Sequence, residues 1–216
     1  VIPTVAPYLL PRLIGAFATH FPDLDPRPRE AVTGRLIDDL LKGRLDAAIV
    51  ALPVSEPALE ERALFDEEFV LVRPLSEANE LVPAPDTLRE MRLLLLEEGH
   101  CFRDQALSFC QLTPSVTREL MEGSSLSTLV QMVGAGIGIT LIPEMAVPIE
   151  TRSAMVSVAR LSRPRPTRTI GMVWRRSSPL ADHLDRVADV VRDVGLEMGT
   201  DLGGGSGARA GGMAPG

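Results

Sequence analysis

The stretch that most constrains this 216-residue chain begins with a block of four leucines at residues 93–96 and ends at Cys110. A short, unbroken apolar run of this kind is typical of a buried strand. After Gly99, apolar residues recur at helical spacing with polar residues between them, and Cys101 stands at the start of that pattern. The sequence therefore predicts a strand, a tight turn at Gly99 and a helix that begins near Cys101.

Both cysteines of the chain lie in this segment. The free N–H groups and the dipole of a helix start favour a thiolate at Cys101, and His100 and Arg103 would add positive charge nearby. If residues 101–110 form one helix, nine steps of about 1.5 Å separate the cysteines by roughly 13 Å along its axis. Nine steps of about 100° also place them on opposite faces. Because a disulfide needs Cα atoms within roughly 7 Å, the two thiols either never bond or bond only when the helix unwinds.

Charge and composition exclude several classes of protein. The formal net charge of −7 argues against a fragment that grips DNA by itself, because phosphate binding needs a basic face. Hydrophobic residues make up 45% of the chain, enough to bury one or two cores. Two cysteines in a chain of this length do not form a secreted disulfide framework, and they suit a reducing cytoplasm.

The sequence favours neither export nor a membrane location. The first residues contain no basic region of the kind that opens a secretory signal. The most apolar window, residues 126–142, is interrupted by Gln131 and by three glycines. A membrane helix would be longer and more uniform, so we expect no membrane contact.

Apolar periodicity predicts alternating strands and helices over the first 72 residues. We expect strands at 1–5, 27–31, 45–52, 59–64 and 67–72, a helix at 7–21, and a second helix that Thr33 precedes and Gly43 caps at its C-terminus. This order is typical of a parallel sheet covered on both faces. The pair Arg73 and Pro74 would then cross into a second lobe.

The remaining residues predict a second set of elements. We expect helices at 88–91, 126–133 and 180–194, strands at 116–121, 155–161 and 168–175, and a turn followed by a strand at 136–143. Ser124 or Ser125 would cap the helix at 126–133. The strand at 168–175 would cross back to the first lobe, and the glycine-rich residues 199–216 should form a disordered tail.

The sequence Gly-His-Cys-Phe-Arg-Asp-Gln at residues 99–105, followed by Cys110, closely resembles the redox motif of the OxyR group, the peroxide-sensing LysR-type transcriptional regulators. The resemblance extends from Val1 to a helix that ends near Gly195. It implies an α/β, periplasmic-binding-protein-like fold, the LysR effector domain, with two Rossmann-like lobes joined by two crossovers.

The resemblance also implies a division of the chain. Residues 1–72 with 170–198 would form a regulatory lobe, and residues 73–169 would form the lobe that carries the redox pair. A cleft between lobes is the default ligand site of such a fold. We expect the N-terminal DNA-binding domain of the family to be absent from this chain, and DNA to be contacted only through that domain.

The resemblance assigns roles to individual residues. Cys101 would be the peroxidatic cysteine, which hydrogen peroxide oxidises to a sulfenic acid, and Cys110 would be the resolving cysteine that forms the disulfide. A thiol reductant would restore the starting state. The residues expected to bind peroxide or to surround the sulfur are Thr4, Thr33, His100, Arg103, Asp104, Gln105 and Arg168.

Ordinary structural roles stay open for several of these residues. A threonine at a strand end is commonly a backbone cap, although Thr4 and Thr33 lie at the edge where α/β sheets bind ligands. Arg168 belongs to a basic run that solvation alone would explain, and polar residues 103–105 suit a solvated first helical turn. Cys110 would be buried and inert until Cys101 is oxidised.

We expect no cofactor and no metal, because the cysteine spacing and the scattered histidines do not match a zinc site. The family implies a homodimer or a dimer of dimers, and a regulator rather than an enzyme. Two alternatives stay open. One is a LysR-type domain that binds a small-molecule inducer in the cleft, with the cysteines incidental. The other is a peroxidase that turns over like a peroxiredoxin.

Overall fold

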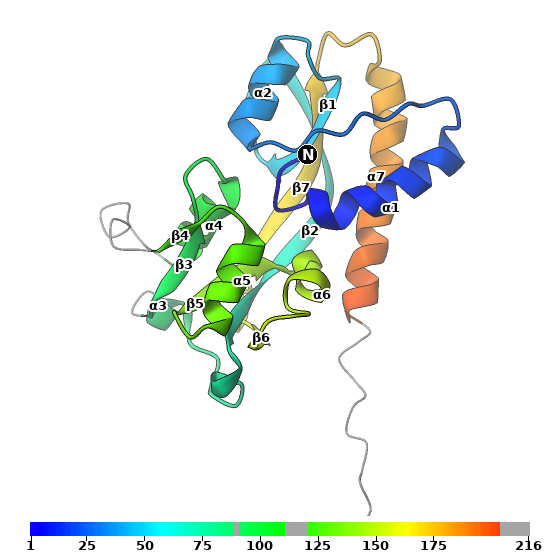
Figure 1. Cartoon of the computed structure of the whole chain (residues 1–216). Coiled ribbons are helices and arrows are strands. Elements are labelled where there is room, and N and C mark those ends of the chain that lie inside the picture. The colour runs from blue at the N-terminus through cyan, green and yellow to red at the C-terminus, as the bar shows by residue number, and fades with distance from the viewer. Residues whose placement is uncertain (89–90, 111–120, 204–216) are drawn as a thin grey trace, which may run out of the picture.

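A computed structural model describes residues 1–88, 91–110 and 121–203 of the chain. Its strands form a sheet in the order β1-β7-β2-β5-β3-β4, and β6 also pairs with β2. Figure 1 shows two groups of elements arranged along the long strand β2 (Leu59–Pro74). This strand passes through both groups, so the two halves of the molecule share one continuous sheet.

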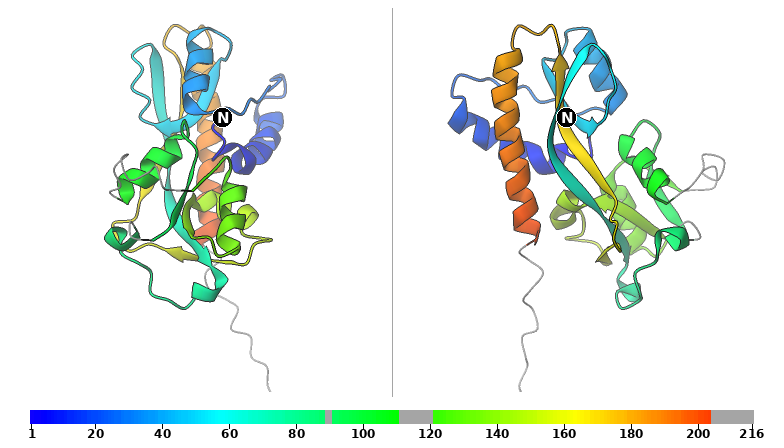
Figure 2. Two further views of the ribbon diagram at one scale, coloured as in Figure 1. Left: turned by 60° about the vertical axis from the view of Figure 1, so that its left-hand side comes forward. Right: turned by 180° about the vertical axis from the view of Figure 1, so that it is seen from behind.

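The first half of the sheet is antiparallel. Strand β7 lies between β1 and the first part of β2 and pairs with both in antiparallel register. The long helix α7 runs along this half and continues toward the second, as both views of Figure 2 show. The elements of this half are α1 (Ala6–His20), α2 (Thr33–Leu41), β1 (Ala47–Leu52), β7 (Thr167–Arg175) and α7 (Ala181–Gly203).

The second half mixes strand directions. Strand β3 pairs in parallel with β4 and β5, whereas the end of β2 pairs in antiparallel register with β5 and β6. The strands of this half are β3 (Leu93–Leu96), β4 (Glu122–Gly123), β5 (Ile139–Pro143) and β6 (Val156–Arg160). Its helices are η1 (Leu75–Glu77), α3 (Pro85–Leu88), α4 (Cys101–Phe109), α5 (Leu126–Gly134), η3 (Glu144–Ala146) and α6 (Val147–Glu150).

The leucine strand anchors the cysteine helix. All four side chains of β3 are buried, as the apolar run predicts. Gly99 then turns the chain with a φ of 92°, a conformation that glycine adopts without steric cost. Helix α4 buries Phe102, Ala106 and Leu107, and the Phe102 ring packs on Phe69 of β2 with centroids 4.8 Å apart. The predicted strand, turn and helix are therefore confirmed.

Other local predictions are also confirmed, within a few residues at most. The helices at 7–21, at 126–133 and from Thr33, and the strands at 45–52, 155–161 and 168–175, are all present. Ser125 caps α5, because its Oγ accepts a hydrogen bond from the Thr128 N–H at 3.2 Å. Strand β7 returns to the first half of the sheet as expected.

The predicted parallel first lobe is wrong. Residues 1–5 and 27–31 are not strands; they are irregular segments tied by single backbone bonds, such as Ile2 N–H to the Ile49 carbonyl at 3.1 Å. Ile2 is buried by packing and not by a strand ladder, which is why its apolar character misleads. Residues 59–64 and 67–72 were predicted as two strands, but both belong to β2. The strand continues through a local register shift between Ala63 and Phe65 and does not end there.

The C-terminal helix is longer than predicted, because α7 continues to Gly203, past the expected start of the tail at 199. Residues 204–216 of that tail, and nearly all of the strand predicted at 116–121, lie outside the described residues. No helix in residues 1–88, 91–110 and 121–203 is long and apolar enough to span a bilayer. The lobe boundaries at 72–73 and 169–170 stay a prediction.

Candidate functional site

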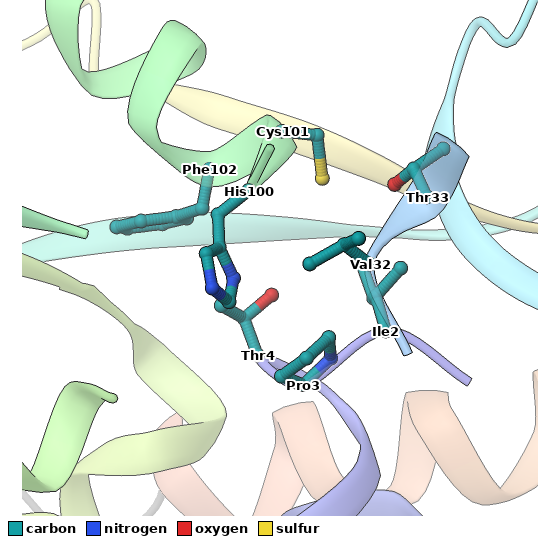
Figure 3. A pocket seen from close by; sticks show the side chains of 8 residues that line it. All are labelled: Ile2, Pro3, Thr4, Val32, Thr33, His100, Cys101 and Phe102. Carbon is teal, nitrogen blue, oxygen red and sulfur yellow. The ribbon is translucent and has the colours of Figure 1, made fainter. Parts of the chain in front are cut away.

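A small, shallow pocket lies beside Cys101. Three segments that are distant in sequence build it: the residues before α1, the start of α2 and the start of α4. Figure 3 shows the Cys101 sulfur and the hydroxyls of Thr4 and Thr33 pointing toward the same space. The lining residues are Ile2, Pro3, Thr4, Val32, Thr33, His100, Cys101 and Phe102.

The turn at Gly99 places Cys101 at the head of α4. His100 is the N-cap residue with an extended backbone, and its side chain forms no capping bond. Cys101 is partly exposed. Because it is the first residue of α4, its sulfur lies near the backbone N–H groups that have no intrahelical acceptor. Burial lowers the pKa of His100, and its ring is therefore neutral at pH 7.

The hydroxyl of Thr33 is the unusual group of this pocket. Its Oγ1 atom is buried and has no hydrogen-bond partner among the described residues. Thr33 is the first residue of α2, but the cap position belongs to Val32. Since nearly all buried polar atoms find a partner, an unpaired hydroxyl that faces a pocket indicates a place for a small polar ligand.

Thr4 has the opposite environment, because a buried arginine holds it. Arg168 donates from Nη1 to Thr4 Oγ1 at 2.7 Å and from Nη2 to the Thr4 carbonyl at 3.1 Å. The Arg168 side chain is 0% exposed, which excludes the solvated arginine considered from the sequence. Its guanidinium carbon also lies 5.3 Å from the centre of the Phe102 ring. Arg168 therefore contacts two walls of the pocket without lining it.

Glu67 is a residue that the sequence analysis missed. It lies opposite Arg168 in the register of β2 and β7. Its Oε2 atom accepts from Arg168 Nε at 2.9 Å, and its Oε1 atom accepts from the Met145 N–H at 3.1 Å. Burial raises the pKa of the Glu67 carboxyl, and the charge and hydrogen bonds of Arg168 oppose that change. The only signal in sequence is an acid within a strand, which is uninformative until the pairing of the strands is known.

Besides Arg168, three residues predicted to contact peroxide lie outside the pocket lining. Arg103 donates from Nη1 to the Leu96 carbonyl at 2.8 Å and to Glu122 Oε1 at 2.5 Å, which ties α4 to the ends of β3 and β4. Asp104 is exposed, and Gln105 has a buried Oε1 atom without a partner among the described residues. Their assignment as peroxide contacts stays a prediction that this geometry does not support.

Cys110 lies at the far end of the same helix. It is the C-cap residue of α4 and is 0% exposed. Burial raises the pKa of its thiol to about 11. Both cysteines are free. Helix α4 runs without a break from Cys101 to its C-cap at Cys110, as expected from the sequence. The two thiols are thus separated by a folded helix and differ strongly in exposure.

A second hollow, with a cavity volume of about 120 Å³, shares Thr4 and His100 with the first. Its wall contains Glu150, which accepts a hydrogen bond from the Tyr8 hydroxyl at 2.7 Å and another from Ser127. Burial raises the pKa of Tyr8 and keeps its phenol protonated. Sequence reasoning did not identify this cluster. In the part of the chain that the structure describes, no group of three or more His, Cys, Asp or Glu side chains is arranged to hold a metal.

Known proteins resemble this chain along most of its length. A family model described as the LysR substrate binding domain matches residues 1–195. A probable hydrogen peroxide-inducible genes activator of Streptomyces viridosporus is 42% identical over 197 residues, which are 89% of this chain and 63% of that protein. The DNA-binding transcriptional dual regulator OxyR of Escherichia coli K12 is 42% identical over 195 residues, 88% of this chain and 63% of the regulator. The chain thus spans slightly less than two thirds of these relatives.

Solved structures give the same result. A cysteine variant of Corynebacterium glutamicum OxyR with bound hydrogen peroxide has a TM-score of 0.88 at 31% identity, covering 99% of this chain and 69% of that one. The reduced OxyR regulatory domain of Pseudomonas aeruginosa has a TM-score of 0.79 at 35% identity, covering 90% and 93% of the two chains. These likenesses confirm the α/β, periplasmic-binding-protein-like fold class. The chain therefore belongs to the LysR substrate-binding domain family and, within it, to the OxyR group of transcriptional regulators.

Proposed function

We propose that this chain is the peroxide-sensing regulatory domain of an OxyR-type transcription regulator. The observation that carries the proposal is the pocket in which the Cys101 sulfur faces two threonine hydroxyls, one of them the unpaired Thr33 hydroxyl (Figure 3). Hydrogen peroxide is small and both donates and accepts hydrogen bonds, so it suits a narrow pocket of this chemistry. The names of the relatives, which include peroxide-inducible activators, support the same substrate.

The first chemical step is an attack of the Cys101 thiolate on one peroxide oxygen. The S–O bond forms as the O–O bond breaks, and the leaving oxygen takes up the proton that the thiol had lost, which gives sulfenic acid and water. Negative charge develops on the leaving oxygen during this step. Donors aimed at that oxygen lower the barrier, and we assign this role to Thr4, Thr33 and His100.

The second step joins Cys110 to the oxidised Cys101 with loss of water. Because a folded α4 keeps the sulfurs apart, the helix must unwind for the disulfide to form. The new conformation would be passed to DNA through the N-terminal domain of a homodimer or a dimer of dimers. A thiol reductant of the cytoplasm would then reverse the switch.

A single stoichiometric dose of hydrogen peroxide tests the proposal. Mass spectrometry of the treated protein should find a Cys101–Cys110 disulfide, and a Cys110→Ser variant should accumulate sulfenic acid at Cys101 instead. A Cys101→Ser variant is the matched control and should stay reduced. If the unaltered protein reacts no faster than an unfolded thiol, the proposal fails.

The same preparation separates a sensor from the two alternatives. A sensor should consume about one equivalent of peroxide for each disulfide, whereas sustained consumption with a thiol donor would indicate a peroxidase. A small-molecule inducer that raises the melting temperature, with a DNA response that survives Cys101→Ser in the full-length regulator, would indicate an inducer-binding domain.

A further inference from the structure

A buried chain of polar contacts runs from the backbone of η3 to the wall of the Cys101 pocket. It begins at the Met145 N–H, passes through the Glu67 carboxylate to the Arg168 guanidinium, and ends at Thr4. Arg168 places two nitrogens on Glu67 Oε2, at 2.9 Å for Nε and 2.7 Å for Nη2. The Arg168 and Glu67 side chains are 0% and 5% exposed, so water does not compete for these contacts.

The contact with Arg168 fixes what the Thr4 hydroxyl does. A hydroxyl has one proton to donate and two lone pairs that accept. Arg168 Nη1 occupies one lone pair of Thr4 Oγ1, and the structure records no acceptor for the Thr4 hydroxyl proton among the described residues. Since Thr4 lines the pocket, that proton is free to donate to a molecule bound beside Cys101. The positive charge behind the oxygen strengthens such a bond.

Arg168 keeps this position only with a partner of opposite charge. A guanidinium cannot lose its proton, and a buried one without an anion is strongly unfavourable. Glu67 supplies the anion, and the Met145 N–H fixes the Glu67 carboxylate from its other side. Glu67 does not line the pocket, so it would act on the reaction only through Arg168.

We propose that Glu67 is a positioning residue for the peroxide reaction, because it holds Arg168 so that Thr4 presents its hydroxyl proton to the leaving peroxide oxygen. This inference rests on the proposed function. Glu67 lies outside the pocket, and we expect it to affect the rate of the peroxide reaction without changing the nucleophilicity of Cys101. Thr4 donates a hydrogen bond in this step and keeps its proton, so the balance of atoms and electrons is that of sulfenic acid formation.

Two reagents distinguish positioning from a general structural role. Hydrogen peroxide has a leaving oxygen that needs a donor, whereas iodoacetamide alkylates the Cys101 thiolate and leaves iodide behind. In a Cys110→Ser background, Glu67→Gln should slow oxidation of Cys101 by peroxide about tenfold, less than complete removal of an oxyanion donor causes, because Thr4 keeps its hydroxyl and loses only its position. The rate of alkylation at the same pH should stay within about twofold, because the sulfur itself is unaltered.

The neighbouring carboxylate on the same strand is the matched control. Glu68 pairs with Arg160 and Arg165, and among the described residues the structure records no hydrogen bond or ion pair between the Glu68 carboxylate and Arg168 or Thr4. Glu68→Gln should leave both rates unchanged. In a Thr4→Val background, Glu67→Gln should add little to the slowing that Thr4→Val causes alone, because both changes remove the same donor.

If Glu67→Gln fails to fold, Glu67→Asp decides, because it keeps the charge and moves the carboxylate away from Arg168. A selective loss of the peroxide rate supports the proposal, and equal losses with both reagents overturn it. A folded Glu67→Gln protein that keeps its peroxide rate also overturns it, while the peroxide reaction of Cys101 itself stands. Only a parent protein that is alkylated normally and fails to react with peroxide overturns the proposed function as well.

Discussion

The two ends of helix α4 give the two cysteines opposite surroundings. At the start of the helix, Cys101 is partly exposed and faces the hydroxyl of Thr33 across a small pocket. At its end, Cys110 is 0% exposed and belongs to the hydrophobic core. One helix of nine residues therefore keeps one thiol open to small solutes and the other closed to them.

This contrast indicates how the response to an oxidant can be ordered in time. The buried thiol cannot reach the exposed one while α4 is folded, because the helix sets their separation. From this fold we expect oxidation to occur first at Cys101, and Cys110 to become available only after the helix opens.

Forming the disulfide should abolish the difference between the two ends. We expect α4 to unwind and to withdraw Phe102 and Leu107 from the core, at a cost of roughly 1.5–3 kcal/mol for each side chain. A disulfide over so short a loop constrains the unfolded chain by only about 3 kcal/mol. The oxidised domain should therefore be no more stable toward urea than the reduced one.

Amide hydrogen exchange at residues 98–110 is the measurement, with α7 as an internal reference that should keep its protection in both redox states. If mass spectrometry confirms the Cys101–Cys110 disulfide and the amides of α4 nevertheless stay protected, disulfide formation does not require the helix to unwind.

Alkylation should measure the contrast directly in the reduced protein. With a pKa of about 11, roughly one Cys110 thiol in a thousand is ionised at pH 8, and burial hinders access further. Iodoacetamide should therefore modify Cys101 at least about 100-fold faster than Cys110. Peptide mass spectrometry gives both rates, and the difference should vanish in concentrated urea. Similar rates in the folded state would show that Cys110 is accessible without unwinding.

The burial of Cys110 should also make stability depend on pH. Its folded pKa of about 11 lies above the unfolded value near 8.5, so the folded state retains a proton that the unfolded state loses. The stabilisation is fully present below about pH 8.5 and is lost as the pH rises through about 11, by roughly 3 kcal/mol. Urea denaturation under reducing conditions should show a larger fall between about pH 8.5 and 10 in Cys101→Ala than in Cys110→Ala, because only the first variant keeps the buried Cys110 thiol. An identical pH dependence in the two variants would contradict the assignment.

The surroundings of Cys101 could be predicted from sequence only where local patterns define them. The leucine run, Gly99 and the helical spacing after it are local, and they were sufficient for the strand, the turn and α4. The two pocket threonines were predicted only from the family resemblance. No local pattern in the sequence shows that residues so far apart would meet at Cys101. The apolar residues 1–5 misled, because periodicity indicates burial and does not show whether a buried segment joins a ladder.

The pair formed by Glu67 and Arg168 could not be predicted in the same way. Its two residues are about a hundred positions apart, and they meet only through the antiparallel register of β2 and β7. The expected parallel first lobe would have placed those strands differently. Strand direction depends on connections and packing across the whole sheet. A buried ion pair that forms only in one strand pairing therefore cannot be predicted from local sequence patterns.

The smallest effect tests whether the Cys101 end reacts because it is exposed or because its pocket binds peroxide. Thr33→Val removes the unpaired hydroxyl with little change in volume. Since that hydroxyl is buried without a partner, its loss should leave the free energy of unfolding unchanged or raise it by about 1 kcal/mol. Stopped-flow oxidation of Cys101 should nevertheless slow about tenfold, which corresponds to about 1.4 kcal/mol of barrier. Thr33→Ser should restore the rate, and Thr19→Val, at an exposed position of α1, should affect neither quantity. If Thr33→Val gains stability and keeps the oxidation rate, the unpaired Thr33 hydroxyl takes no part in the reaction. The different reactivities of the two cysteines would then follow from their exposure alone.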